Sequence, residues 1–246
     1  MDLFPDRAHV RLRSAAHGTY LYADEDGVGV SFRPRRASLN TVWAVHRIER
    51  SGNSYLLLHS AAYGRYLAAS PEYISYAGHG VVQCSYFNDV DQQDILWKAI
   101  RYCDEGDDLL LSNPRYGSWP ILWAVEAVPA RVGPPLLPPP TPQAPPAVLR
   151  RLILFMEGDD YMNINFQGTR VLFFEGRSVS QLRDELAEGL DEWHPIRITM
   201  CIWAGSHGRL TPLVTDLPFN NQTMEIVVFE SWSPAAREFV YPDVDA

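Results

Sequence analysis

The sequence predicts a mainly β protein in two parts, a β-trefoil with a shortened third repeat and an α+β domain of the β-grasp (ubiquitin-like) kind. Three observations support this fold class. The first half holds three approximate repeats, a run of prolines follows, and the second half alternates strands with one helix. We place the β-trefoil at residues 1–129, a proline-rich linker at 130–147, the β-grasp domain at 148–232 and a tail at 233–246.

The repeat consists of a short apolar run, a turn that contains glycine, and a Tyr-Leu pair. Residues 10–21 read VRLRSAAHGTYL, residues 56–67 read LLLHSAAYGRYL, and residues 109–117 read LLLSNPRYG. This pattern is typical of two strands joined by a tight turn, in which glycine supplies the positive φ. One such hairpin cannot bury its apolar face alone. Three hairpins around one core therefore predict a β-trefoil.

The third repeat is short. Each copy ends in a tryptophan, and the distance from the turn glycine to that tryptophan is 25, 33 and 6 positions for the pairs Gly18–Trp43, Gly64–Trp97 and Gly117–Trp123. We therefore expect the middle of the third repeat to be missing. The loss of one hairpin leaves a gap, and apolar surface there has to be covered or used for binding.

The linker is rich in proline. Residues 129–146 contain nine prolines in eighteen positions, a composition that favours an extended and semi-rigid spacer. Residues 135–138 also match the P-x-x-P spacing of recognition peptides. We hypothesise that Leu136 and Leu137 fold back from the linker to cover the gap in the trefoil.

The second half combines strands with a helix. Ser178 followed by Gln181 is a capping box, and the apolar positions after it have helical spacing, at Val179, Leu182, Leu186 and Leu190. Apolar runs predict strands at residues 152–156, 171–174, 198–203, 208–214 and 224–229. This order predicts a sheet with a helix on one face. We expect the polar tail to fray.

Composition excludes several classes of function. The net charge is −9, which disfavours binding to nucleic acid or to anionic membranes, and the chain has no apolar run long enough to span a membrane. The three cysteines and the scattered histidines form no metal-binding pattern, and no nucleophile motif or dinucleotide fingerprint occurs. We therefore expect no enzymatic activity, no cofactor and no metal. The acidic start of the sequence lacks the features of a secretory peptide, so we expect a cytoplasmic or nuclear location.

Several segments resemble a known family. They are similar to the plant family catalogued as domain of unknown function 569. The segments are Val10–Ser14, Gly18–Asp26, the Trp43 segment, Gly176–Arg183 and Gly208–Pro218. The first half of that family resembles the fascin-like, actin-cross-linking β-trefoils, so the resemblance implies a plant protein and actin as a candidate partner. The family completes its third repeat, whereas this chain does not. The family has no established activity.

The sequence thus predicts a non-enzymatic interaction module, an adaptor for a protein partner, with actin as the candidate. The alternative is a trefoil that binds a glycan or small ligand in a shallow aromatic pocket, with Tyr73, Tyr76 and Trp119 as its residues. The Q-x-W repeat of ricin-type lectins is absent, which counts against this alternative. The candidate binding residues are these three aromatics together with Leu136 and Leu137.

Overall fold

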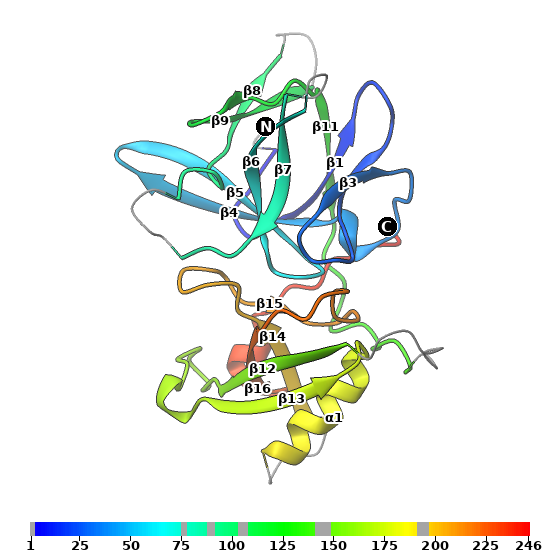
Figure 1. Cartoon of the computed structure of the whole chain (residues 1–246), viewed down its shortest axis with the longest axis vertical. Helices are drawn as coiled ribbons and strands as arrows, with labels where there is room; N and C mark the ends of the chain where they lie inside the picture. The colour runs from blue at the N-terminus through cyan, green and yellow to red at the C-terminus, as the bar shows by residue number, and fades with distance from the viewer. Residues whose placement is uncertain (1–2, 75–77, 88–91, 103–107, 141–148, 191–196) are drawn as a thin grey trace.

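The computed structural model describes residues 3–74, 78–87, 92–102, 108–140, 149–190 and 197–246. It shows two domains in contact, the first built from β1–β11 and the second from β12–β16 with helix α1 (Figure 1).

The first domain is a β-trefoil, as predicted. Six strands pair in the ring β1–β4–β5–β8–β9–β11–β1, which closes a barrel. Their bounds are His9–Ser14 (β1), Trp43–Arg50 (β4), Asn53–Ser60 (β5), Lys98–Arg101 (β8), Leu109–Asn113 (β9) and Trp123–Val128 (β11). The core inside is apolar and includes Leu12, Leu58 and Leu111, one leucine from each repeat.

The hairpins that cap the barrel differ between repeats. The first repeat contributes β2 (Tyr20–Ala23) with β3 (Val30–Arg33), and the second contributes β6 (Tyr66–Ile74) with β7 (Gly78–Cys84). From the turn glycine of the third repeat to its closing strand β11 there is only the two-residue strand β10 (Gly117–Ser118), which pairs with β9. A short 3-10 turn, η1 (Leu39–Thr41), leads into β4. The prediction of a shortened third repeat is confirmed.

The repeat turns use glycine as the sequence indicates. Gly18, Gly64 and Gly117 have φ values of 67°, 67° and 78°. Side chains with a Cβ rarely adopt this left-handed conformation.

The shortened repeat leaves one tryptophan without a hydrogen-bond acceptor. Trp43 Nε1 donates to the carbonyl oxygen of Leu21 at 3.2 Å, and Trp97 Nε1 donates to that of Leu67 at 2.9 Å. Both acceptors belong to the Tyr-Leu pair of the same repeat, which the third repeat lacks. The corresponding Nε1 of Trp123 is buried and has no partner in the described structure.

The gap in the third cap is filled by aromatic rings of the trefoil itself. Trp119 is buried, with its ring centroid 5.0 Å from that of Trp123, and Phe32 of the first hairpin stacks on Trp123 at 5.8 Å. The hypothesis that Leu136 and Leu137 cover this gap is wrong. Leu136 is 97% exposed, and Leu137 packs against the core of the second domain, because the linker runs along that domain.

The second domain has the ubiquitin-like order predicted for it. Its five-stranded sheet runs β13–β12–β16–β14–β15, with the central pair β12 and β16 parallel. The strands are Arg150–Glu157 (β12), Arg170–Glu175 (β13), Ile198–Ile202 (β14), Thr211–Pro212 (β15) and Met224–Glu230 (β16). A 3-10 turn, η2 (Phe166–Gly168), precedes β13.

Helix α1 (Val179–Gly189) covers one face of this sheet. The Ser178 side chain accepts a hydrogen bond from the backbone N–H of Gln181 at 3.3 Å, which confirms the predicted N-cap. Val179, Leu182 and Leu186 are buried against β-strand residues of the same core.

The two domains are docked directly, so the linker does not act as the spacer that its composition indicates. The backbone N–H of Tyr86 in the trefoil donates to the carbonyl of Ala204 at 2.8 Å, and the N–H of Arg209 donates to the Tyr66 hydroxyl at 2.9 Å. His59 Nδ1 lies 3.0 Å from Thr211 Oγ1 in β15. The edge of the sheet at β15 therefore faces the trefoil, and the edge at β13 faces away (Figure 1).

The tail is ordered, and the expectation that it frays is wrong. It forms helix α2 (Pro234–Arg237), whose alanines are buried, and Phe239 then packs edge-on against Phe229 of β16 at 5.4 Å. Beyond α2 the tail returns to the trefoil, where Pro242 forms a bridge with Ala130 and Arg11 Nη2 donates to the Val244 carbonyl at 2.6 Å. Burial of the apolar side chains of this segment, among them Ala235, Ala236 and Tyr241, accounts for this order.

Candidate functional site

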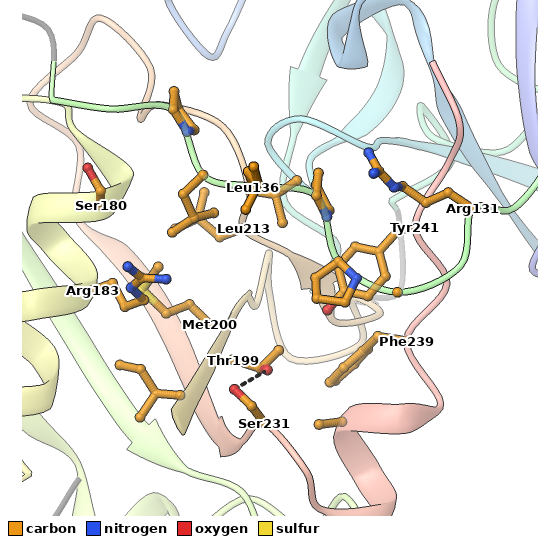
Figure 2. Close-up of a pocket in the computed structure, with 18 of the residues that line it drawn as sticks. Arg131, Leu136, Ser180, Arg183, Thr199, Met200, Leu213, Ser231, Phe239 and Tyr241 are labelled. Atoms are coloured by element: carbon orange, nitrogen blue, oxygen red, sulfur yellow. Dashed lines mark hydrogen bonds between the residues drawn. The ribbon is translucent and has the colours of Figure 1, made fainter. Parts of the chain in front are cut away.

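An open cavity lies where the linker, the ubiquitin-like domain and the tail meet. We call it the junction groove. It has a volume of about 1170 Å³ and is open to solvent. Linker residues 130–139, helix α1, strand β14 and residues 231–241 line it, and the linker meets the tail where the Arg131 N–H donates to the Tyr241 carbonyl at 2.9 Å (Figure 2).

Most of the groove surface is apolar. Met200 and Leu213 are buried side chains at its floor, and Leu136 lies across from them on the linker (Figure 2). Phe239 and Tyr241 contribute aromatic rings from the tail. Such an apolar lining with a few polar groups is typical of sites for small ligands.

The polar groups of the groove are few and include three arginines. Arg183 of α1 extends toward the floor, with Ser180 on the preceding turn of the same helix (Figure 2). The Nε of Arg183 is buried and has no hydrogen-bond partner in the described structure, and the Asp184 carboxylate is 4.0 Å away. The Thr199 hydroxyl donates to Ser231 Oγ at 3.1 Å. Arg131 and Arg237 are exposed at the rim.

A second feature is an apolar patch on the sheet of the ubiquitin-like domain. Leu152 pairs with Phe173, and Leu154 pairs with Val171, so these four side chains share the face opposite α1. We call them the sheet patch. Val171 and Phe173 are 55% and 80% exposed, and Arg150 pairs with Glu175 at 2.7 Å at the end of the patch.

A third feature is a group of histidines at the domain interface. His9 and His59 line a cavity of about 210 Å³ together with Arg209 and Thr211, while His46 contacts the Tyr66 hydroxyl at 3.0 Å. Burial lowers the pKa of His9 to about 4, and burial together with the charge of Arg209 lowers the pKa of His46 to about 4. Burial also holds the pKa of His59 well below its usual value. The imidazoles of these three histidines are therefore neutral when the two domains are docked.

The predicted binding residues do not come together in one site. Leu136 and Leu137 belong to the linker at the second domain, and Leu136 lines the junction groove. Trp119 is buried in the trefoil core, where it fills the third cap. The backbone of Tyr73 pairs with His79 in the β6–β7 hairpin, and Tyr76 lies outside the described residues.

Sequence reasoning missed Arg183 and the tail residues of the groove. Arg183 occupies the same helical stripe as Val179, Leu186 and Leu190, and a cation in an apolar stripe is the signal that could have identified it. The tail had no such signal, because its aromatics stand among prolines and charged residues.

The described part of the chain holds no group of three His, Cys, Asp or Glu side chains that could bind a metal ion. No helix in this part of the chain combines the length and the hydropathy needed to cross a membrane.

Comparisons with known proteins match the two domains separately. Residues 1–119 match the β-trefoil domain of unknown function DUF569, and residues 149–229 match the DUF569-associated ubiquitin-like domain. No curated protein matches the chain.

Solved structures resemble the trefoil half at low identity. The apo BEL β-trefoil (crystal form 3) has a TM-score of 0.39 and 15% identity, over 51% of this chain and 97% of that chain. The GlcNAcα1-4Gal releasing endo-β-galactosidase from Clostridium perfringens has a TM-score of 0.35 and 18% identity, over 50% of this chain and 33% of that chain. At these values neither likeness bears on function.

Proposed function

The chain belongs to the DUF569 family, a β-trefoil joined to its associated ubiquitin-like domain, and we propose that it is a non-enzymatic adaptor that binds a protein partner through the sheet patch. The observation that supports this proposal is the exposure of Val171 and Phe173 on a sheet whose opposite edge is already docked to the trefoil. Clustered exposed apolar side chains on a β-sheet face mark interaction sites more often than isolated ones do.

The position of the sheet patch suits a recruiting surface. It lies on strands β12 and β13, at the far side of the sheet from the trefoil (Figure 1). A partner bound there would leave the trefoil surface free for a second contact. Actin filaments are the candidate for such a contact that the fascin-like resemblance suggests, and we place this activity in the cytoplasm.

The alternative of a glycan site in the trefoil has less support. Of its three aromatic residues, Trp119 is buried at 6% exposure and packs against Trp123, so it cannot stack on a sugar without leaving the core. A shift of tryptophan fluorescence on titration with sugars would nevertheless favour this alternative.

The test compares partner capture by the intact chain with capture by the double variant Val171→Thr, Phe173→Ser. The substitutions remove apolar surface from exposed positions, so the fold should persist. A matched control, Tyr102→Ser with Val132→Thr, removes the same kind of surface elsewhere, since these side chains are 62% and 103% exposed.

We expect a partner protein that is captured by the intact chain and by the control, and lost with the patch variant. The same proteins in all three captures would contradict the role of the sheet patch. Cosedimentation with actin filaments, run on the same three proteins, tests actin separately.

A further inference from the structure

We propose that the junction groove is a binding site for an amphipathic monocarboxylate, a ligand with one carboxylate on a long aliphatic or multi-ring apolar body. This inference rests on the groove alone and does not depend on the sheet patch.

The carboxylate end of the ligand is inferred from Arg183. Its side chain is 30% exposed, leaves α1 on the buried stripe and extends into the groove (Figure 2). Its buried Nε has no acceptor among the described residues, and the Asp184 carboxylate at 4.0 Å is beyond hydrogen-bond distance. Nε itself is enclosed by protein, so a ligand carboxylate would pair with the outer nitrogens of the guanidinium.

The charge around the groove favours an anion. Three arginines and one aspartate line it, although the whole chain has a net charge of −9. A guanidinium matches the two oxygens of a carboxylate in a bidentate pair. Of the three arginines, Arg183 is the one that lies inside the part of the groove that the structure describes, because Arg131 and Arg237 are exposed at the rim. One internal cation in an apolar setting suits a single negative charge better than the double charge of a phosphate ester.

The apolar body of the ligand is inferred from the walls. Met200 and Leu213 form a buried floor, and Phe239 stands on the tail side (Figure 2). Leu136 of the linker also lines the groove and is 97% exposed, so its aliphatic side chain has nothing packed on it. An apolar ligand between linker and floor would cover Leu136 and bury its own surface. The volume of about 1170 Å³ admits a body of considerable length.

Two sources carry this chemistry, a free carboxylic acid and the terminal carboxylate of an apolar peptide. The test therefore uses dodecanoate below its micelle concentration, methyl dodecanoate as the uncharged analogue, and an apolar hexapeptide with a free or an amidated C-terminus. Binding is measured by calorimetry and by the fluorescence of the intact protein, since Trp232 lines the groove.

We expect at least one carboxylate probe to bind saturably, and roughly ten-fold or more tightly than its uncharged form, the scale of a charge-assisted hydrogen bond. Arg183→Gln should abolish this preference. Leu136→Ser, at an exposed position that cannot affect folding strongly, should weaken binding of charged and uncharged probes alike. Arg101→Gln, an exposed arginine of β8 outside the groove, is the matched control and should change nothing.

The pattern of results also separates the sources. Binding of dodecanoate alone indicates a free acid, and binding of the peptide alone indicates a chain terminus. Failure of every carboxylate probe to bind, equal affinity for charged and uncharged forms, or no effect of both Arg183→Gln and Leu136→Ser would overturn the proposal. None of these outcomes alters the capture experiment on the sheet patch.

Discussion

At the scale of single residues, burial of ionisable and polar side chains decides how this protein responds to its surroundings. His9 and His46 lie near the domain interface with pKa values lowered to about 4, chiefly by burial. Asp6 pairs with Arg209 across the same interface at 3.0 Å. The interface thus combines neutral imidazoles with one partly exposed ion pair.

These histidines predict a loss of stability in weak acid. Above about pH 6.5 they are neutral in both the folded and the unfolded chain. As the pH falls below this value the unfolded chain binds protons first, so the free energy of unfolding decreases by about 1.4 kcal/mol per pH unit for each histidine until the folded pKa is reached. Urea unfolding between about pH 4.5 and about pH 7.5 measures this slope.

The control for the pH effect is His46→Gln, since glutamine can still hydrogen-bond to the Tyr66 hydroxyl. This variant should have a shallower slope than the natural chain. An equal slope in the two proteins would show that His46 does not contribute to the pH dependence of the free energy of unfolding. Asp6 does not interfere, because its lowered pKa places its titration below the window.

At the scale of elements, the shortened third repeat costs the trefoil one buried hydrogen bond. Trp43 and Trp97 each donate a hydrogen bond from Nε1 to the Tyr-Leu strand of their own repeat, whereas Trp123 has no such acceptor. The rings of Trp119 and Phe32 replace the apolar contacts of the missing hairpin but not its carbonyl.

Substitution of each closing tryptophan by phenylalanine should reveal this difference. All three changes remove ring volume from the core, but only Trp43→Phe and Trp97→Phe also break a hydrogen bond and leave a buried carbonyl unpaired. We expect Trp123→Phe to lose less unfolding free energy than the other two, by about 1 kcal/mol or more. Chemical denaturation of the three variants gives the comparison. A loss at Trp123 as large as at Trp97 would show that its Nε1 has a partner in solution.

Much of the element structure could be predicted from sequence, because its signals are local. The turn glycines mark the repeats, and Ser178 with the leucines after it marks α1. The junction groove could not be predicted, since it arises from segments far apart in the chain. Arg183 had a local signal, but the tail and the direct docking of the domains depend on backbone contacts that leave no pattern in the sequence.

At the scale of the whole molecule, the two domains depend on close backbone approach. Gly205 has a φ of 96°, and a Cβ added there would lie 2.4 Å from the carbonyl oxygen of Tyr86 in the other domain. The same two segments exchange hydrogen bonds, from Tyr86 N to Ala204 O and from His207 N to Tyr86 O. The interface leaves no room for a side chain at this point.

The change Gly205→Ala should therefore separate the domains. The matched control is Gly133→Ala, where φ is 74° and nothing lies within 4 Å of the added carbon, so both variants bear the strain of about 1–2 kcal/mol but only the first meets an obstacle. We expect a larger radius of gyration by small-angle scattering and two unfolding transitions for Gly205→Ala alone. One transition and an unchanged radius would show that the interface adapts.

The pairing of Ala130 with Pro242 has a further consequence for how the domains move. The chain leaves the trefoil at Ala130 and comes back to it at Pro242, where Asp243 N also donates to the Pro129 carbonyl at 2.8 Å. A single covalent connection would let the ubiquitin-like domain rotate about its own axis once the interface opened. The second, noncovalent connection opposes such rotation, because the pairing of Ala130 with Pro242 would have to break before the domain could turn about the linker.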